Sequence, residues 1–153
     1  MGYKLLEAVS SKQNLVVIDN SIIVRWLVGD GSDTDREIAN LILNAISLKE
    51  ICPIVPSLWI YEASNVIASY VKRTQIEESI GLKRLMMPFE ACNIIEFKPS
   101  LELLTLTAIK YKLSSYDATY LYLAETLNCP LATLDKKLGK AVIKSNGQLF
   151  KLK

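Results

Sequence analysis

Four carboxylic acids, Asp19, Glu62, Asp117 and Asp135, stand where their side chains could act together. Two of them follow predicted strands, one falls in the first turn of a predicted helix, and Glu62 lies on a predicted helix that is apolar on nearly every side. Clustered carboxylates repel each other and raise each other's pKa, so such a group stays ionised mainly where a divalent cation offsets the repulsion. Oxygen ligands without histidine or cysteine favour a hard ion, Mg²⁺ or Mn²⁺.

Each acid taken alone also has an ordinary structural explanation. Asp19, Asp117 and Asp135 could cap or stabilise helix N-termini, and Glu62 could pair with a lysine. Such explanations account for any one of the acids better than for all four together, because three of the acids are expected at the same edge of the sheet. A second group of acids contains Asp30, Asp33 and Asp35. Their spacing does not match the ligand positions of a calcium-binding loop, so we interpret them as part of a solvated loop and the start of a helix.

The composition narrows the chemistry further. The 153 residues contain no histidine, which excludes Ser-His-Asp and Cys-His catalysis, histidine-based ribonuclease chemistry and the histidine motifs of zinc proteases. The three cysteines are widely spaced and form no CxxC pair, so we interpret them as buried free thiols rather than as a zinc site or disulfides. Any catalysis must therefore use carboxylates, hydroxyls, lysines or a metal ion.

The chain alternates predicted strands with predicted helices. Strands are predicted at residues 15–18, 50–55, 93–97, 130–134 and 147–152, and helices at 22–28, 34–48, 58–73, 75–87, 99–112, 118–127 and 135–144. This order predicts the α/β class, with a parallel sheet and helices on both faces. Because ligand sites in such sheets lie beyond the carboxyl ends of the strands, Asp19 and Asp135 are expected at one edge, which Asp117 can also face.

Capping residues and prolines set the predicted helix boundaries. Asn20 or Ser21 is expected to cap the helix after the first strand, and Thr34 with Glu37 matches a capping box. Pro88 is expected to end the helix that precedes it.

The ends of the chain carry further expectations. Residues 1–14 have only weak helical spacing, and we interpret them as an N-terminal arm before a single domain at residues 15–153. The longest apolar run, residues 51–70, contains Glu62, and the N-terminus lacks the apolar segment of a signal peptide, so we expect a cytoplasmic protein without a membrane span. The net charge is only +2, but six lysines and no acid follow Asp135, which indicates either a solvated helix face or a nucleic-acid surface.

Four short motifs, in this order, resemble those of PIN-domain ribonucleases. They are Val17-Ile18-Asp19-Asn20-Ser21, then Pro56-Ser57 with Glu62-Ala63-Ser64-Asn65-Val66, then Ser115-Tyr116-Asp117-Ala118 with Tyr120-Leu121, and last Thr133-Leu134-Asp135-Lys136-Lys137-Leu138. The resemblance covers roughly residues 15–152 and is closest to the VapC-type toxins of prokaryotic toxin–antitoxin pairs. The last two motifs are its most specific part.

This resemblance implies a three-layer α/β/α sandwich with a parallel central sheet, and a Mg²⁺- or Mn²⁺-dependent endoribonuclease. It makes the four acids the catalytic and metal-binding residues, with polar neighbours that orient them: Ser21, Asn65 and Thr133. Basic side chains are expected to hold the RNA backbone: Arg25, Lys136, Lys137 and Lys140. A small antitoxin protein is the implied partner, and a homodimer is expected. The longer N-terminal arm and Asn20 depart from the family pattern without changing an acid.

Other functions stay open on the sequence alone. The domain could be an RNA-binding or RNA-processing module without a toxin role, or a nuclease of ribosomal RNA maturation, although the extra segments expected of the latter are missing. A phosphotransferase with Asp19 as its nucleophile is disfavoured, because pockets resembling haloacid dehalogenases need a second aspartate where this chain has Ser21.

Overall fold

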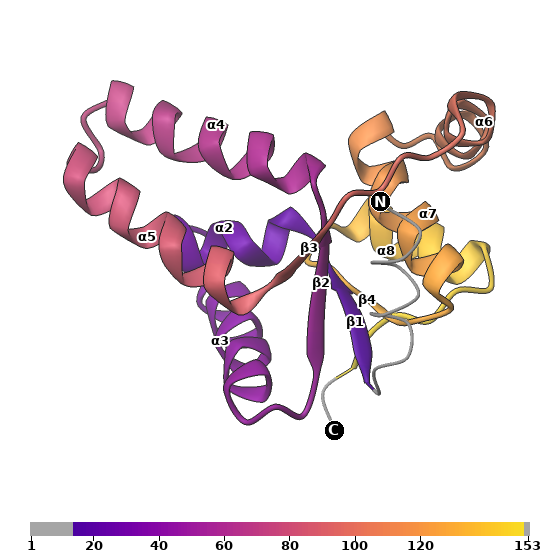
Figure 1. Ribbon diagram of the computed structural model, residues 1–153, viewed down its shortest axis with the longest axis horizontal. Coiled ribbons are helices and arrows are strands. Elements are labelled where there is room, and N and C mark those ends of the chain that lie inside the picture. Colours follow the sequence, from indigo (N-terminus) through magenta and orange to yellow (C-terminus); the bar gives the residue numbers. More distant parts are fainter. Residues whose placement is uncertain (1–13, 152–153) are drawn as a thin grey trace.

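A parallel sheet of four strands forms the centre of the molecule (Figure 1). The computed structural model describes residues 14–151, so the predicted arm lies outside the described residues except for Asn14. The strands pair in the order β3-β2-β1-β4, and all three pairings are parallel, as predicted. Their bounds are β1 Leu15–Ile18, β2 Cys52–Pro56, β3 Asn93–Ile95 and β4 Leu131–Ala132.

The central strand β1 is buried on both sides. Leu15 and Val17 belong to one apolar cluster, while Val16 and Ile18 belong to the other. Successive side chains of a strand point to opposite faces, so a strand covered on both faces needs an unbroken apolar run. The sequence LVVI meets this requirement, which explains why the run predicts a buried strand.

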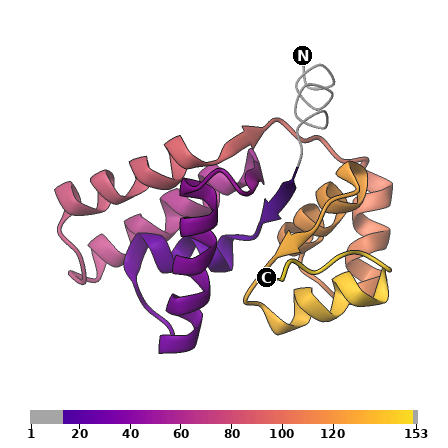
Figure 2. The ribbon, with the colours of Figure 1, turned by 90° about the horizontal axis from the view of Figure 1, so that it is seen from below.

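Helices cover both faces of the sheet, and the predicted three-layer α/β/α sandwich is confirmed (Figures 1 and 2). One layer contains α2 (Asn20–Val28), α3 (Asp33–Ser47), α4 (Leu58–Lys72) and α5 (Glu78–Ala91). The other contains α6 (Leu101–Tyr111), α7 (Ser115–Leu127) and α8 (Lys136–Lys144). None of the described helices combines the length and the apolar character needed to cross a membrane.

Two predicted helix caps are wrong. The cap of α2 is Asp19, which has extended backbone angles (φ −75°, ψ 151°) and accepts a hydrogen bond from the Ser21 N–H, so neither Asn20 nor Ser21 has this role. Helix α3 has its capping box at Ser32 and Asp35 rather than at Thr34 and Glu37. In both cases an earlier Asp or Ser takes the position, because several adjacent side chains are suited to capping and the sequence does not rank them.

Two further boundaries also differ from the predictions. Helix α5 continues through Pro88 to Ala91. The proline removes the N–H donor that would bond the carbonyl four residues earlier, but the chain continues helically for one more turn, where the Cys92 N–H donates to the Pro88 carbonyl at 3.0 Å. Of the predicted final strand at residues 147–152, the part within the described residues, up to Lys151, forms one parallel bridge between Leu131 and Leu149, and residue 152 lies outside them.

The three cysteines are free thiols, as predicted. Cys92 and Cys129 are buried, and Cys52 is partly buried. Burial raises the pKa of Cys92 to about 12 and that of Cys129 to about 11, so neither thiol is a ready nucleophile near neutral pH.

Candidate active site

The topology brings the ends of several segments to the carboxyl edge of the sheet. Asp19 directly follows β1, and its N–H donates to the Ala132 carbonyl of the neighbouring strand β4 at 2.9 Å. Helix α7 leads into β4, so its first turn, which carries Asp117, lies at the end where β4 finishes. Helix α4 begins directly after β2, which places Glu62, in its second turn, at the same edge.

Asp19 is buried and held by hydroxyl groups from two chain segments. Its Oδ2 accepts hydrogen bonds from the Ser21 hydroxyl at 2.5 Å and from the Thr133 hydroxyl at 2.8 Å. The Leu134 N–H in turn donates to the Ser21 hydroxyl at 2.9 Å. Burial raises the pKa of Asp19, the bonds from Ser21 and Thr133 lower it, and the charge of Asp117 raises it further. Hydrogen bonds from Ser21 and Thr133 therefore fix the position of this carboxylate.

Glu62 reaches the same region from α4. Its Oε2 accepts a hydrogen bond from the Tyr120 hydroxyl of α7 at 2.5 Å. Burial raises the pKa of Glu62 to about 7, and the charges of Asp19 and Asp117 act in the same direction, whereas the bond from Tyr120 opposes the rise. Glu62 therefore changes protonation near neutral pH.

Asp117 is half-buried in the first turn of α7. Its Oδ2 accepts from the Ser114 hydroxyl at 2.6 Å, and its N–H donates to the same hydroxyl at 3.1 Å. Because its charge raises the pKa of both Asp19 and Glu62, the three side chains form one electrostatically coupled group. We call Asp19, Glu62 and Asp117 the acid cluster.

Asp135 is connected to the acid cluster indirectly. This exposed residue caps α8, and its Oδ1 accepts from the N–H groups of Lys137 at 2.7 Å and Leu138 at 2.8 Å. Its own N–H donates at 2.9 Å to the Thr133 hydroxyl, which donates to Asp19. The structural explanation of Asp135 as a helix cap is therefore correct, and one hydroxyl joins that cap to the acid cluster.

The remaining predicted site residues lie apart from these hydrogen bonds. Asn65 is exposed, one helical turn beyond Glu62 on α4. Arg25 forms an ion pair with Asp30, which also accepts a hydrogen bond from the Tyr70 hydroxyl, so Arg25 ties α2 to the loop that follows it. The predicted RNA-binding lysines are all exposed on α8: Lys136, Lys137 and Lys140. The RNA contacts of these basic residues stay predictions.

The chemistry of the four acids suits a hard cation, but their side chains are not arranged as a complete coordination site. Among residues 14–151, no group of three or more acidic or cysteine side chains is arranged so that it could hold a metal ion. The donors are nevertheless all oxygens, and the cluster contains two carboxyl groups whose pKa is raised by burial and by neighbouring acids. A divalent cation would relieve this repulsion, so the donor set fits Mg²⁺ or Mn²⁺ by its chemistry.

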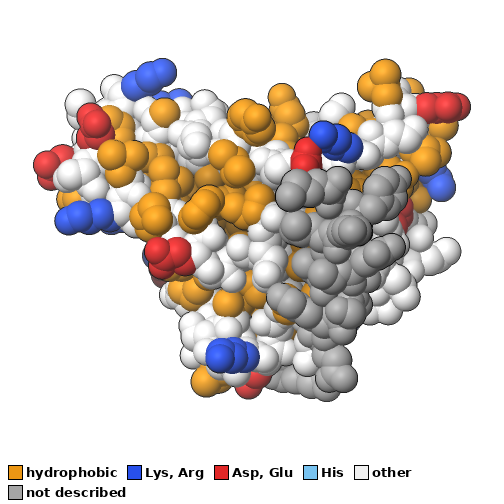
Figure 3. All heavy atoms as spheres, viewed as in Figure 1, with side chains coloured by type: hydrophobic (Ala, Val, Ile, Leu, Met, Phe, Trp, Pro, Cys, Tyr) orange, Lys and Arg blue, Asp and Glu red, His pale blue; other side chains and the backbone are white. Residues whose placement is uncertain are grey.

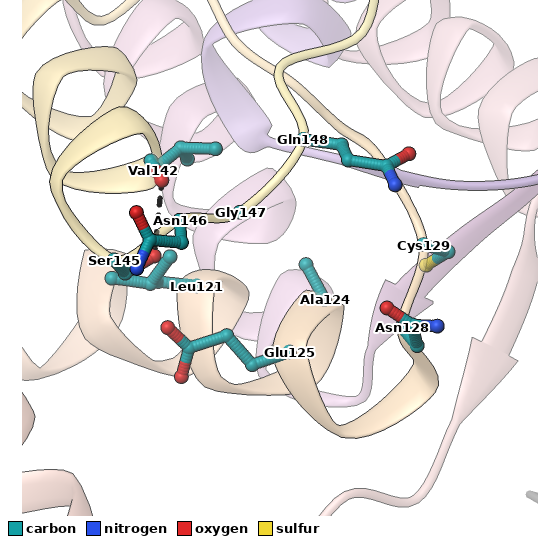
Figure 4. A pocket seen from close by; sticks show the side chains of 10 residues that line it. All are labelled: Leu121, Ala124, Glu125, Asn128, Cys129, Val142, Ser145, Asn146, Gly147 and Gln148. Atoms are coloured by element: carbon teal, nitrogen blue, oxygen red, sulfur yellow. Dashed lines mark hydrogen bonds between the residues drawn. The ribbon is translucent and has the colours of Figure 1, made fainter.

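A well-defined pocket elsewhere in the molecule is not this site. It has a volume of about 190 Å³ and lies between the C-terminal ends of α7 and α8, at the opposite edge of the sheet (Figure 4). Its lining includes Glu125, Asn128 and Gln148 but none of the four predicted acids. The coupled carboxylates, rather than this hollow, mark the candidate active site.

The comparisons with known proteins identify the family and support the fold. The model of the PIN domain family matches residues 16–144. The chain belongs to the PIN domain family. PIN domains are in general nucleases, and typically use divalent metals, so membership indicates nuclease chemistry for this chain.

The other comparisons concern the fold. This PIN domain is similar to the crystal structure of PAE2754 from Pyrobaculum aerophilum, with 22% sequence identity and a TM-score of 0.66. The similarity covers 89% of this chain and 83% of that one, and at this identity it supports the fold alone. A search of the curated proteins gives no match.

Tyr120 belongs to the third of the sequence motifs, but the sequence assigns it no role in the candidate site. It is fully buried, and its hydroxyl contacts Glu62, which is 58 positions earlier in the chain. A buried tyrosine usually needs a hydrogen-bond partner for its hydroxyl, so its place beside the apolar residues Ala118, Leu121 and Leu123 was a usable signal. The identity of that partner depends on the tertiary fold, and no local pattern contains it.

Proposed function

We propose that this PIN domain is a metal-dependent endoribonuclease and the toxin of a toxin–antitoxin pair, acting in the cytoplasm. The observation that carries the proposal is the acid cluster: three carboxylates come from three elements at the carboxyl edge of a parallel sheet, and the charges of Asp19 and Asp117 help to raise the pKa of Glu62. Such an arrangement is costly for the fold without a cation, and is therefore better explained by function than by stability.

In this proposal the acid cluster and Asp135 hold Mg²⁺ or Mn²⁺. The ion, when bound, would acidify a water molecule and offset negative charge on the scissile phosphate. Ser21 and Thr133 fix one oxygen of Asp19, and among the described residues no hydrogen bond is made to its other oxygen, Oδ1. Ser114 and Tyr120 likewise engage one oxygen of Asp117 and one of Glu62. Each acid thus keeps an oxygen for a ligand while its neighbours hold it in place.

The start of α8 supports nucleic acid as the substrate. Lys136 and Lys137 directly follow Asp135, and Lys140 lies one turn later, so exposed ammonium groups begin beside the last of the acids. Lysines contact phosphates as point charges and carry no sequence information, so we assign them to holding the RNA backbone.

An exposed apolar surface supports a protein partner. Hydrophobic side chains gather over α4 and α5 in Figure 3. Two adjoining apolar hollows between these helices share Ser64 and Leu85, and the exposed side chains around them include Ile60, Leu82, Met86 and Phe89. Large exposed apolar patches mark interaction sites more often than ordinary surface does. We propose that a small antitoxin covers this surface, and that the protein forms a homodimer.

Cleavage of RNA by the purified protein tests the proposal. A labelled RNA and a DNA of the same sequence are incubated with the protein in Mn²⁺, in Mg²⁺ and in EDTA. We expect cleavage of RNA only with a divalent ion, and a loss of at least about 100-fold in Asp117→Asn. The control is Asp33→Asn, which changes an exposed aspartate at the start of α3 and should keep full activity.

Cleavage that persists in EDTA and in Asp117→Asn would indicate a contaminating nuclease and refute the metal mechanism. The toxin role is tested separately by expression in cells. We expect growth arrest that requires Asp117 and is relieved by co-expression of a small antitoxin from a neighbouring reading frame. Arrest by the Asp117→Asn variant would contradict that role.

A further inference from the structure

We propose that Tyr120 is a positioning residue of the nuclease site: its hydroxyl holds one oxygen of Glu62, so that the other oxygen is presented to a divalent ion beside Asp19 and Asp117. The inference rests on the proposed function, because it takes Glu62 to be a ligand of that ion. Neither the sequence motifs nor the family assignment gives Tyr120 this role.

The Tyr120 hydroxyl is a fixed point. The residue has no exposed surface, and its ring packs in the apolar cluster that α7 forms with the sheet, next to Leu121 and Ala124. Close packing leaves such a ring one orientation. Glu62, in contrast, is only partly buried and has three rotatable side-chain bonds, so its carboxylate has no fixed position of its own. The 2.5 Å bond from Tyr120 supplies that position.

The bond also joins the two helical layers. Helices α4 and α7 lie on opposite sides of the sheet (Figures 1 and 2). Among the described residues, the bond between Tyr120 and Glu62 is the only side-chain hydrogen bond between these two helices. Tyr120 stands three residues after Asp117, on the same side of α7. One helix therefore carries both an acid of the cluster and the group that positions another acid.

A purely structural role would predict a different result. In that case Glu62 would only satisfy the buried phenol, and removal of the hydroxyl would change stability without changing ion binding through Glu62. Tyr122 offers a matched control on the same helix. It packs edge-on against Phe97, with ring centroids 5.6 Å apart, and among the described residues its hydroxyl makes no hydrogen bond.

The experiment measures Mn²⁺ binding to metal-free protein by calorimetry at pH 8. The variants are Tyr120→Phe, Tyr122→Phe, Glu62→Gln and the double variant with Tyr120→Phe and Glu62→Gln. We expect Tyr120→Phe to weaken Mn²⁺ binding by about 10- to 100-fold, as is typical when a group that orients a metal ligand is removed. Tyr122→Phe should bind like the wild type, and Tyr120→Phe should add no further loss to Glu62→Gln. In RNA cleavage, Tyr120→Phe should lower kcat and leave KM unchanged.

Several results would overturn the inference. One is Mn²⁺ binding by Tyr120→Phe that equals the wild type, and another is an equal loss from Tyr120→Phe with and without Glu62. Should Tyr120→Phe fail to fold, 4-fluorophenylalanine at position 120 takes its place, because it keeps the size of the ring but cannot donate a hydrogen bond, and the same loss is expected. A protein that binds Mn²⁺ through this pair but cleaves no RNA would refute the proposed function and support the positioning role. A wild type that binds no Mn²⁺ would overturn both.

Discussion

The raised pKa of Glu62 makes a quantitative prediction for stability in the absence of metal. The pKa rises from the ordinary 4.5 to about 7, so between these pH values the folded state binds a proton that the unfolded state has released. The free energy of unfolding must therefore fall as the pH rises through this window. At about 1.4 kcal/mol per pKa unit the loss is about 3 kcal/mol for a fully buried group, and the partial exposure of Glu62 reduces it to about 2 kcal/mol.

Urea unfolding in EDTA at several pH values from 4.5 to 8 measures this effect. Other groups titrate as well, and burial also raises the pKa of Asp19. The informative quantity is therefore the difference in free energy of unfolding between Glu62→Gln and the wild type. From pH 4.5 to 8, the free energy of unfolding of Glu62→Gln should rise by about 2 kcal/mol relative to that of the wild type, because glutamine cannot ionise. Glu37→Gln, at an exposed position of α3, should show no such trend.

A difference that stays constant from pH 4.5 to 8 would refute the reasoning, since Glu62 would then have an ordinary pKa in the folded protein. Addition of Mn²⁺ at pH 8 provides a second check. It should raise the free energy of unfolding of the wild type by about 3 kcal/mol at a concentration of 100 times the dissociation constant. The same concentration should stabilise Glu62→Gln much less.

Two further predictions concern Thr133 and the lysines of α8. Thr133→Ala should weaken Mn²⁺ binding by about 10- to 100-fold, measured by calorimetry, because Asp19 loses one of the hydroxyls that orient it. Thr126→Ala, which removes a hydroxyl that bonds only to its own helix, is the control and should leave binding unchanged. Replacement of the α8 lysines by glutamine should raise KM for RNA with little change in kcat, and should flatten the dependence of log KM on log salt concentration by about 0.7 for each phosphate that is no longer neutralised. The variant replaces Lys136, Lys137 and Lys140 together. A salt dependence of KM equal to that of the wild type would contradict the role of these lysines in holding RNA.

The fold was predictable because its main signals are local. A parallel strand buried on both faces needs a continuous apolar run, and the segment Leu15–Ile18 is such a run, followed at once by Asp19. The order of strands and helices then places the ends of β1 and β4 together. The failed boundaries have different causes. Capping at Asp19 rather than at Asn20 is decided by a difference of about 1 kcal/mol between neighbouring residues. Pro88 does not end α5 because the loss of one N–H donor leaves the remaining helix bonds in place.

The arrangement within the site was less predictable. The sequence indicates that Ser21 and Thr133 stand near Asp19, because each lies within two residues of an acid that follows a strand. It does not indicate that both hydroxyls donate to the same oxygen of Asp19, nor that Tyr120 donates to Glu62. Nor does it show that Arg25 is paired with Asp30. These contacts depend on which elements pack together, and the distances between partners are set by tertiary structure rather than by spacing along the chain.

The four acids are not equivalent in what stabilises their charge. Asp19 and Asp135 cap helices, and Asp117 lies in the first turn of another, so each is next to the positive end of a helix dipole. Glu62 lies in the second turn of α4, where the dipole has little effect, and burial raises its pKa to about 7. Within the described residues its hydrogen-bond donor is the Tyr120 hydroxyl. Glu62 therefore depends most on a bound cation, so substitutions at Glu62 or Tyr120 should change the metal requirement more than substitutions at the capped acids change it.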